Sequence, residues 1–369
     1  MIGQGGMGAV WRARHALTGR KLAVKTLEQG YLANQAVVQR FGREARAASA
    51  VHHPGIVEVL DLDQTEEGVP FLVMEFLEGE SLASRIERRG RLGQEELLRL
   101  GTMLLEALDA AHSHGVVHRD LKPENVYVVP AGRRGEAIKI LDFGISHKAD
   151  EATAHKLTVT GSVLGTPHYM SPEQAMGEEI DHRADLYAAG VVLYECAVGD
   201  VPFDAPNYNK LLRTILDSPP VPPRQRGAEI SEGVERVILW ALEKERDARV
   251  SSAREMLRWL RVAAEGGEVP YHARSAPAPT RADDEDAVET EGGRSAGSTD
   301  WGTLPGLSSR PPPPRSAPVE PPPGVLQASL RPAGVPSTPA PQVKSRMPSS
   351  PPPSSGVTEL ELDDPLGAG

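Results

Sequence analysis

The chain has 369 residues, a formal net charge of -11 at pH 7 and a sequence pI of about 5.5. This acidic balance argues against nucleic acid or an anionic membrane surface as the main partner, because both require a basic footprint. No apolar stretch approaches the roughly 20 residues of a membrane-spanning helix, and no basic segment followed by an apolar one opens the chain. We therefore expect a cytoplasmic chain without a membrane span. The single cysteine, Cys196, lies in an apolar segment, which favours a small buried side chain in a reducing compartment.

The first quarter of the chain alternates strand-like segments with turn signals. Residues 8–15 and 21–27 flank the turn sequence ALTGR and predict a β-hairpin. Residues 34–51 are rich in alanine, arginine and glutamate and predict a helix, which the HHPG sequence then ends. Residues 56–64 and 70–77 predict two further strands around a polar turn. This pattern indicates a small sheet with one helix.

The middle of the chain is predominantly helical. Apolar residues recur at helical spacing in the first of these segments, and a glycine is placed to end it. Helices are predicted over residues 94–115, 181–199, 205–217, 231–244 and 252–265. A small sheet followed by a larger helical part is typical of an α+β fold, and a cleft is expected where the two parts meet.

The last part of the chain has a different composition. Prolines cluster at 311–314 and 321–323, and apolar runs longer than two residues are scarce. Such a segment cannot bury a core, so we expect residues 264–369 to form a disordered tail rich in proline, serine and glycine. Its proline runs could dock on the aromatic groove of a soluble partner, although most such runs are spacers.

Glycines recur at the start of the chain, in the segment GQGGMGAV from Gly3 to Val10. Similar spacing occurs in dinucleotide-binding folds, but there it follows a strand and opens a helix, whereas here it leads into a hairpin. Between two strands, glycines let backbone N–H groups approach a phosphate, because no side chain intervenes. Taken alone, the segment could equally be an ordinary hairpin turn.

Lys25 places an ammonium group inside a strand, between apolar neighbours. An unpaired charge in that position would be costly, so the side chain needs an anionic partner. Glu44, in the following helix, is the natural counter-charge, and the pair could hold the lysine against the phosphates of a nucleotide. Without this context, Glu44 would simply be a solvated helix residue.

Three later segments complete a larger pattern. They are HRDLKPENV at 118–126, KILDFGIS at 139–146 and GTPHYMSPEQ at 165–174. Together with the glycine-rich segment, Lys25 and Glu44, they occur in the order found in protein kinases. The chain thus resembles the bacterial, eukaryotic-like (Hanks-type) serine/threonine protein kinases.

The resemblance runs from residue 2 to about residue 263 and carries an expected fold with it. It implies a two-lobed, protein-kinase-like α+β fold. The small antiparallel-sheet lobe would span about residues 1–77 and the larger helical lobe about residues 78–263. The tail over residues 264–369 lies outside the resemblance.

The resemblance also assigns roles in phosphoryl transfer. This reaction concentrates negative charge on a triphosphate, so the site must neutralise and align it. Asp120 would accept the hydroxyl proton and Lys122 would steady the γ-phosphate. Asn125 and Asp142 would bind the metal through hard oxygen ligands. The implied cofactors are ATP and Mg²⁺, with Mn²⁺ as an alternative metal.

An adenine pocket is implied as well. Val10 and Ala23 would cover the ring from above and Tyr127 from below, while Met74 would be the gatekeeper and the backbone after it would hydrogen-bond the base. The complete set of ATP contacts implied by the resemblance is Ile2, Gly3, Gly5, Gly6, Gly8, Val10, Ala23, Lys25, Glu44, Met74, Glu75, Leu77, Tyr127 and Asp142.

The resemblance implies regulatory or structural roles for the remaining family positions. Arg119 resembles the arginine that pairs with a phosphorylated activation segment. Phosphorylation of Thr158, Thr160 or both, by a second copy in a transient homodimer, would then order that segment. Structural roles are implied for Phe143, Gly144, Thr166, Glu173, Asp185 and Arg249.

His112, His114 and His118 lie close together in the sequence and raise the alternative of a metal site. No cysteine or carboxylate cluster completes such a ligand set, so structural roles are favoured. His118 matches the family's structural histidine and is expected to pack near Phe143.

The chain departs from the family pattern at two positions. Only Met1 and Ile2 precede the glycine segment, where relatives have a complete strand; either residues upstream supply that strand or this form is impaired, and we favour the first. Ala48 stands where a larger apolar residue usually follows the helix glutamate.

Three functions remain to be compared. The loop around Lys122 and the segment around Thr166 favour a kinase that phosphorylates serine and threonine in protein substrates. A pseudokinase scaffold that recruits partners through the proline-rich tail is the main alternative. A kinase-fold enzyme for small molecules is a third, but such enzymes usually lack the GTPHYMSPE type of segment.

Overall fold

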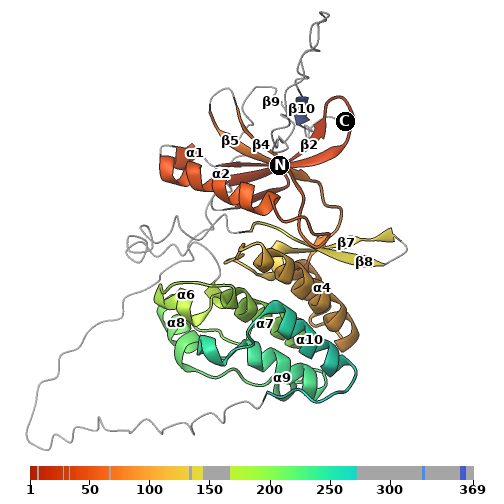
Figure 1. Cartoon of the computed structure of the whole chain (residues 1–369), viewed down its shortest axis with the longest axis vertical. Helices are drawn as coiled ribbons and strands as arrows, with labels where there is room; N and C mark the ends of the chain where they lie inside the picture. Colours follow the sequence, from red (N-terminus) through yellow and green to blue (C-terminus); the bar gives the residue numbers. More distant parts are fainter. Residues whose placement is uncertain are drawn as a thin grey trace, which may run out of the picture. The chain divides into compact units, whose positions relative to one another are not determined.

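The computed structural model describes residues 1–5, 8–27, 29–32, 34–65, 68–132, 135–143, 167–271, 326–328 and 358–362 (Figure 1). The chain divides into two compact units, Met1–Ala273 with Val325–Gly369, and Arg274–Gly324. All the described residues belong to the first unit. No helix in these ranges combines the length and the hydropathy needed to cross a bilayer.

An antiparallel sheet forms the N-terminal lobe. Its strands are β1 (Gly3–Gly5), β2 (Gly8–His15), β3 (Lys21–Leu27), β4 (Val59–Gln64) and β5 (Pro70–Glu75), joined by β9 (Leu326–Ala328) and β10 (Thr358–Leu362). The order is β4-β5-β3-β2-β10-β9, and β1 pairs with the start of β2. The predicted hairpin is confirmed: Gly19 adopts φ 67° in the turn between β2 and β3, and its N–H donates to the carbonyl of His15.

Both faces of the sheet bury apolar side chains. Successive residues of a strand point to opposite faces, so Ala23 of β3 contacts one cluster and Val24 contacts another. The first cluster includes Val37 and Phe41 from α2 (Gln35–Ser49), which follows the short helix α1 (Gln29–Leu32). The helix predicted in this lobe therefore covers one face of the sheet.

The C-terminal lobe is mainly helical. Its α-helices are α3 (Leu82–Arg89), α4 (Gln94–Ser113), α6 (Pro172–Met176), α7 (Arg183–Val198), α8 (Tyr208–Asp217), α9 (Glu232–Ala241) and α10 (Ala253–Ala264). A small sheet of β6 (Glu80–Ser81), β7 (Val126–Pro130) and β8 (Glu136–Ile140) lies beside them. Short 3-10 turns occur at η1 (Pro123–Asn125), η3 (Pro167–Tyr169), η4 (Pro223–Arg226) and η5 (Arg246–Ala248). The antiparallel-sheet lobe and the helical lobe confirm the predicted kinase-like α+β fold.

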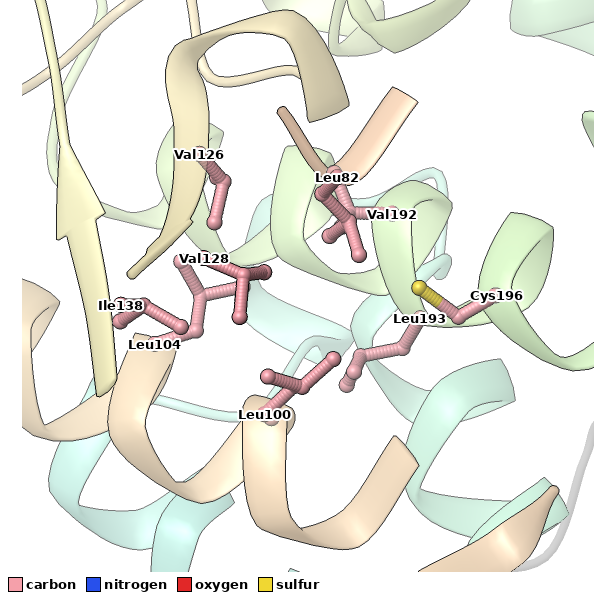
Figure 2. A pocket seen from close by; sticks show the side chains of 10 residues that line it. Leu82, Leu100, Leu104, Val126, Val128, Ile138, Val192, Leu193 and Cys196 are labelled. Atoms are coloured by element: carbon pink, nitrogen blue, oxygen red, sulfur yellow. The ribbon is translucent and has the colours of Figure 1, made fainter. Parts of the chain in front are cut away.

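Helix α7 is the central element of this lobe, because it is buried along almost its whole length. Gly190 permits close packing there: a Cβ at this position would lie 2.8 Å from the Cβ of Ala241 in α9. The core leaves a cavity of about 10 Å³ between α4, α7 and the small sheet (Figure 2). This volume is about that of one water molecule, so the cavity is a packing defect and no ligand site. Cys196 lines it as a buried apolar side chain, as predicted, and burial raises the pKa of its thiol.

Packing continues beyond the end of α10. Val269 is buried in the core of the lobe, and the ring of Tyr271 stacks on Trp240 at a centroid distance of 5.8 Å. The hydroxyl group of Tyr271 donates to Glu243 Oε1 at 2.6 Å. The folded part of the helical lobe therefore includes Tyr271, and β9 and β10 are the described parts of the segment beyond it.

Candidate active site

The two lobes meet at a parallel bridge between Ile56 and Ile140. The N–H of Ile140 donates to the carbonyl of Gly55 at 2.8 Å, and Lys139 in β8 forms an ion pair with Glu75 at the end of β5. Glu75 is one of the residues expected to hydrogen-bond adenine through its backbone. It therefore lies where the sheet lobe is tied to the helical lobe.

Asp185, at the start of α7, organises the loop at 118–126. Its buried carboxylate accepts hydrogen bonds from the N–H groups of His118 and Arg119, both at 2.8 Å, and contacts His112 Nε2 at 2.8 Å. Burial alone would raise the pKa of Asp185, but the contact with His112 and the neighbouring donors hold it below its usual value. Arg119 adopts φ 67°, a left-handed conformation that costs a non-glycine residue energy, and these bonds to Asp185 stabilise it.

Asp120, Lys122 and Asn125 form one group of polar side chains. Lys122 Nζ lies 3.0 Å from Asp120 Oδ2, and Asn125 Nδ2 donates to the carbonyl of Asp120 at 2.8 Å. The Asn125 side chain is buried, whereas those of Asp120 and Lys122 are partly exposed. The asparagine thereby fixes the loop, and the aspartate stays accessible to a substrate.

Asp142 joins the sheet lobe to this group. Its Oδ1 lies 2.7 Å from Nζ of Lys25 in β3. Burial alone would raise the pKa of Asp142, but the charge and hydrogen bond of Lys25 hold it below its usual value, so the carboxylate is ionised. The preceding residue, Leu141, donates its N–H to the carbonyl of Asn125 at 2.8 Å, which brings the metal-binding pair predicted from the sequence together.

His118 and Phe143 connect the loop at 118–126 to the segment that carries Asp142. The ring of His118 accepts a hydrogen bond from the N–H of Asp120 at 3.2 Å through Nδ1, and its Nε2 contacts the carbonyl of Leu141 at 2.8 Å. Its centroid lies 4.7 Å from that of buried Phe143. His118 is therefore a structural residue that connects the two loops, as expected.

Most of the expected nucleotide contacts lie in the sheet lobe, and Tyr127 lies in the small sheet of the helical lobe. Ala23 and Met74 are buried in one apolar cluster, against which Val10 and Leu77 pack. Gly8 has no room for a side chain, since a Cβ would lie 1.8 Å from the carbonyl oxygen of Thr26. Further backbone positions of the set are Ile2 ahead of β1, Gly3 and Gly5 in β1, and Tyr127 in β7 opposite Lys139.

Several predicted residues lie outside the described part of the chain. These are Gly6, Gly144, Thr158, Thr160 and Thr166, together with the side chain of Glu44, whose backbone belongs to α2. The proposed pair of Lys25 with Glu44 therefore stays a prediction. Lys25 contacts Asp142 instead within the described residues.

The donor set at this junction suits a hard divalent cation. Asn125 uses its amide nitrogen for the contact with Asp120, which leaves its amide oxygen to face a ligand, and Asp142 supplies an ionised carboxylate. Amide and carboxylate oxygens are preferred ligands of Mg²⁺ beside phosphate groups. The residues present therefore fit a metal–nucleotide complex.

Glu173 and Arg249 form the ion pair that the sequence predicts. Two hydrogen bonds of 2.7 Å join the guanidinium group to the carboxylate, and their side chains are 2% and 0% exposed. Burial alone would raise the pKa of Glu173, but the bonds from Arg249 hold it below its usual value. The pair anchors α6, the short helix after the segment at 165–171.

The role of Gln174 in α6 was not predicted from the sequence. Its Nε2 donates to the carbonyl of Arg119 at 2.8 Å, and its Oε1 accepts from the N–H of Ser171 in a capping box. The pattern S-x-x-Q at 171–174 signals the cap but not the long-range bond. Within the described residues, Nε of Arg119 is buried without a hydrogen-bond partner.

His112 and His114 each contact a neighbouring part of the helical lobe. Among the described residues, no group of three or more histidine, cysteine or acidic side chains could hold a metal ion. His112 contacts Asp185, and His114 contacts the carbonyl of Ala110 at 2.9 Å.

Comparisons with known proteins agree with this geometry. The family model for the protein kinase domain matches residues 1–259. Serine/threonine-protein kinase pkn3 of Myxococcus xanthus is 43% identical over 256 residues, which cover 69% of this chain and 47% of the relative. PknB of Mycolicibacterium smegmatis, also a serine/threonine-protein kinase, is 36% identical over 259 residues, which cover 69% of this chain and 41% of the relative.

A solved structure shares the fold. The crystal structure of a double mutant of the PknI kinase domain of Mycobacterium tuberculosis matches with a TM-score of 0.55 and 26% identity, covering 72% of this chain and 93% of that one. The chain spans about half the length of the curated relatives it matches, or less. The motifs, the two-lobed fold and the family match together identify the chain as a member of the protein kinase family, in its bacterial Hanks-type serine/threonine branch.

Proposed function

We propose that this chain transfers the γ-phosphoryl group of ATP to serine and threonine hydroxyls of protein substrates. The supporting observation is the junction between the lobes, where the Lys25–Asp142 ion pair lies beside Asp120, Lys122 and Asn125. Protein kinases use ATP and a divalent metal, and these residues carry the charges that such a ligand requires. No contact among the described residues favours a pseudokinase scaffold.

The residue roles follow from this arrangement. Asp120 orients the substrate hydroxyl and accepts its proton while the oxygen forms a bond to the γ-phosphorus, the bond from that phosphorus to the β,γ-bridging oxygen breaks, and ADP leaves. Lys122, which contacts Asp120, neutralises charge on the transferred group, and Lys25 neutralises charge on the remaining phosphates. A bound Mg²⁺, or Mn²⁺ in its place, would be held by Asn125 and Asp142 and would offset the negative charge of the phosphates.

Regulation by the activation segment is part of the same proposal. Arg119 carries a buried Nε without a hydrogen-bond partner in the described residues, and a phosphate on Thr158 or Thr160 would supply acceptor oxygens. The modification would come from a second copy in a transient homodimer. The phosphate would then bind Arg119, the residue directly before Asp120.

The proposal also covers the compartment in which the reaction takes place and the partner of the proline runs. The reduced, buried Cys196 and the need for ATP support the cytoplasm as the place of action. The proline runs at 311–314 and 321–323 are suited to a soluble partner with an aromatic groove. Domain boundaries near residues 77 and 263 belong to the same proposal; the tail predicted from the sequence for residues 264–369 falls mostly outside the described residues.

Incubation with ATP and Mg²⁺ tests the activity. Wild-type chain and a version extended upstream should incorporate phosphate at serine and threonine, identified by mass spectrometry. Asp120→Asn should lose roughly 10²- to 10⁴-fold in rate, as expected for a lost general base. Asp109→Asn, which breaks only a partly exposed ion pair with Arg254, is the matched control and should keep full activity. ATP binding without incorporation in any version would instead support the scaffold.

A further inference from the structure

The edge of β2 that faces away from β3 is shared by two strands. Since β3 pairs with β2 from Gly8 to Arg14, both β1 and β10 must occupy the opposite edge. There β1 covers Gly8 to Val10, and β10 covers Ala13 to His15. Figure 1 shows β10 beside β2. The outer side of β10 pairs in turn with β9. A segment close to the C-terminal end of the sequence thus extends the sheet that carries the glycine-rich turn.

The two strands run in the same direction and follow one another along β2. Gly3 is opposite Val10, and the N–H of Ile2 donates to the carbonyl of Val10 at 2.8 Å, so the β1 register continues toward Met1 opposite Arg12. Leu362 is opposite Ala13, the next residue of β2. Strand β10 therefore occupies the part of the edge that a longer β1 would take.

Sequence and charge match this register. The segment TELEL alternates leucine and glutamate, and β2 alternates buried Ala13 with exposed Arg12 and Arg14. Residues directly opposite in an antiparallel pair share a face, and the register sets Leu362 opposite Ala13 and Glu361 opposite Arg14. A slip by one residue would set a glutamate opposite Ala13 and a leucine opposite Arg14, so the observed register is the favoured one.

We propose that Thr358–Leu362 is a docking strand that acts within its own chain, completes the nucleotide-binding sheet and stabilises the glycine-rich turn. Without it, β2 would lose its outer partner over Ala13–His15, and the backbone groups of Arg14 that face this edge would be left unpaired in the strand that follows the glycine-rich turn. A tethered strand has an effective concentration on the order of millimolar, so weak pairing persists within one chain. Release of the strand would loosen the turn and lower nucleotide affinity. The effect on affinity rests on the proposed function; the pairing does not.

Hydrogen exchange of the full chain tests the pairing without reference to activity. In wild type, the amides of Ala13–His15 and Thr358–Leu362 should exchange at least about tenfold more slowly than those of an unstructured peptide. Leu360→Pro removes an N–H from a strand paired on both sides and should abolish the protection of Thr358–Leu362 and of the Arg14 amide, whereas Ala13 and His15, whose N–H groups point toward β3, should stay protected. Gln342→Pro, placed between β9 and β10, is the matched control and should change neither.

Charge and competition variants sharpen the test. Glu361→Arg should weaken protection of the amide at position 14, and combining it with Arg14→Glu should restore it. A version with the sequence Thr-Glu-Leu-Glu-Leu directly before Met1 should protect the β2 edge while the native Thr358–Leu362 segment exchanges rapidly.

Nucleotide titration then separates the two claims. The dissociation constant for Mg²⁺–ATP should rise several-fold in Leu360→Pro and stay unchanged in Gln342→Pro. Rapid exchange of Thr358–Leu362 in wild type, or unchanged protection of the Arg14 amide in Leu360→Pro, would overturn the proposal. Protection lost on dilution would also overturn it, because the strand would then come from a second copy. Protection without any ATP binding would leave the docking strand in place and refute the proposed kinase function.

Discussion

The buried pair of Glu173 and Arg249 gives the sharpest test of how this fold is held together. Replacement Glu173→Gln keeps the shape of the side chain but leaves the guanidinium charge without a counter-charge in a site where both side chains are at most 2% exposed. Breaking a buried pair in this way costs about 3–5 kcal/mol, a large fraction of a typical domain stability of about 5–15 kcal/mol. We expect a loss of that size in the free energy of unfolding.

An apolar double variant, Glu173→Met with Arg249→Met, should not recover full stability here. Arg249 also donates to the carbonyls of Glu243 at 2.7 Å and Lys244 at 2.9 Å, and these acceptors would lose their donor. Each unsatisfied buried group costs about 1–3 kcal/mol. The double variant should therefore lie between wild type and Glu173→Gln.

Urea unfolding at pH 7 of wild type, Glu173→Met, Arg249→Met and the double variant yields the coupling energy of the pair. We expect about 3 kcal/mol, against less than about 1 kcal/mol for the partly exposed Arg254–Asp109 pair measured the same way. Because the pKa of Glu173 lies below its usual value of 4.5, this stabilisation is complete above pH 4.5 and is lost as pH falls through the folded-state pKa. Equal coupling energies for the two pairs would refute the reasoning.

Three further changes have defined outcomes. Lys25→Met should raise the pKa of Asp142 and weaken metal-dependent ATP binding at least about tenfold in a fluorescence titration, since the lysine lies 2.7 Å from that carboxylate; unchanged binding would contradict its role. Gly190→Ala should lower the free energy of unfolding by about 1–3 kcal/mol, because the new methyl would lie 2.8 Å from the Cβ of Ala241; a gain from helix propensity would show that α7 can shift. Burial lowers the pKa of Lys244 from 10.5 to about 7. Between pH 7 and pH 10.5 the unfolded chain therefore binds more protons than the folded chain, and the free energy of unfolding should rise with pH. This rise should occur in wild type but not in Lys244→Met. Parallel pH profiles in urea unfolding would contradict that assignment.

Long helices with a regular apolar pattern, hairpins with a clear turn sequence and residues within several adjacent motifs could be predicted from the sequence. The helix at α4 spans 20 residues with a continuous apolar stripe, and the hairpin of β2 and β3 has a clear turn signal. By contrast, α3 escaped prediction because its sequence LASRIERR is crowded with arginine. Arg85 there is only 5% exposed, since carboxylates of Glu80, Glu96 and Glu136 surround it.

Contacts between distant segments could not be predicted from local patterns. The ion pair of Lys139 with Glu75 joins strands of different lobes, and nothing near either residue indicates the other. The strand β10 was hidden for another reason: five alternating residues are a weak signal inside a proline-rich segment. Its partner edge exists only once β2 is folded.

The contacts around Arg119 connect stability with catalysis. Arg249 holds Glu173 in α6, and Gln174 of the same helix donates to the carbonyl of Arg119. Asp185 binds the N–H of that residue from the other side and stabilises its left-handed backbone, which directs the following Asp120 toward the junction between the lobes. A change at Glu173 therefore affects both the packing of α6 and the position of Arg119. In Glu173→Gln, kcat should fall further than the unfolded fraction accounts for, because α6 would no longer hold the carbonyl of Arg119 in place.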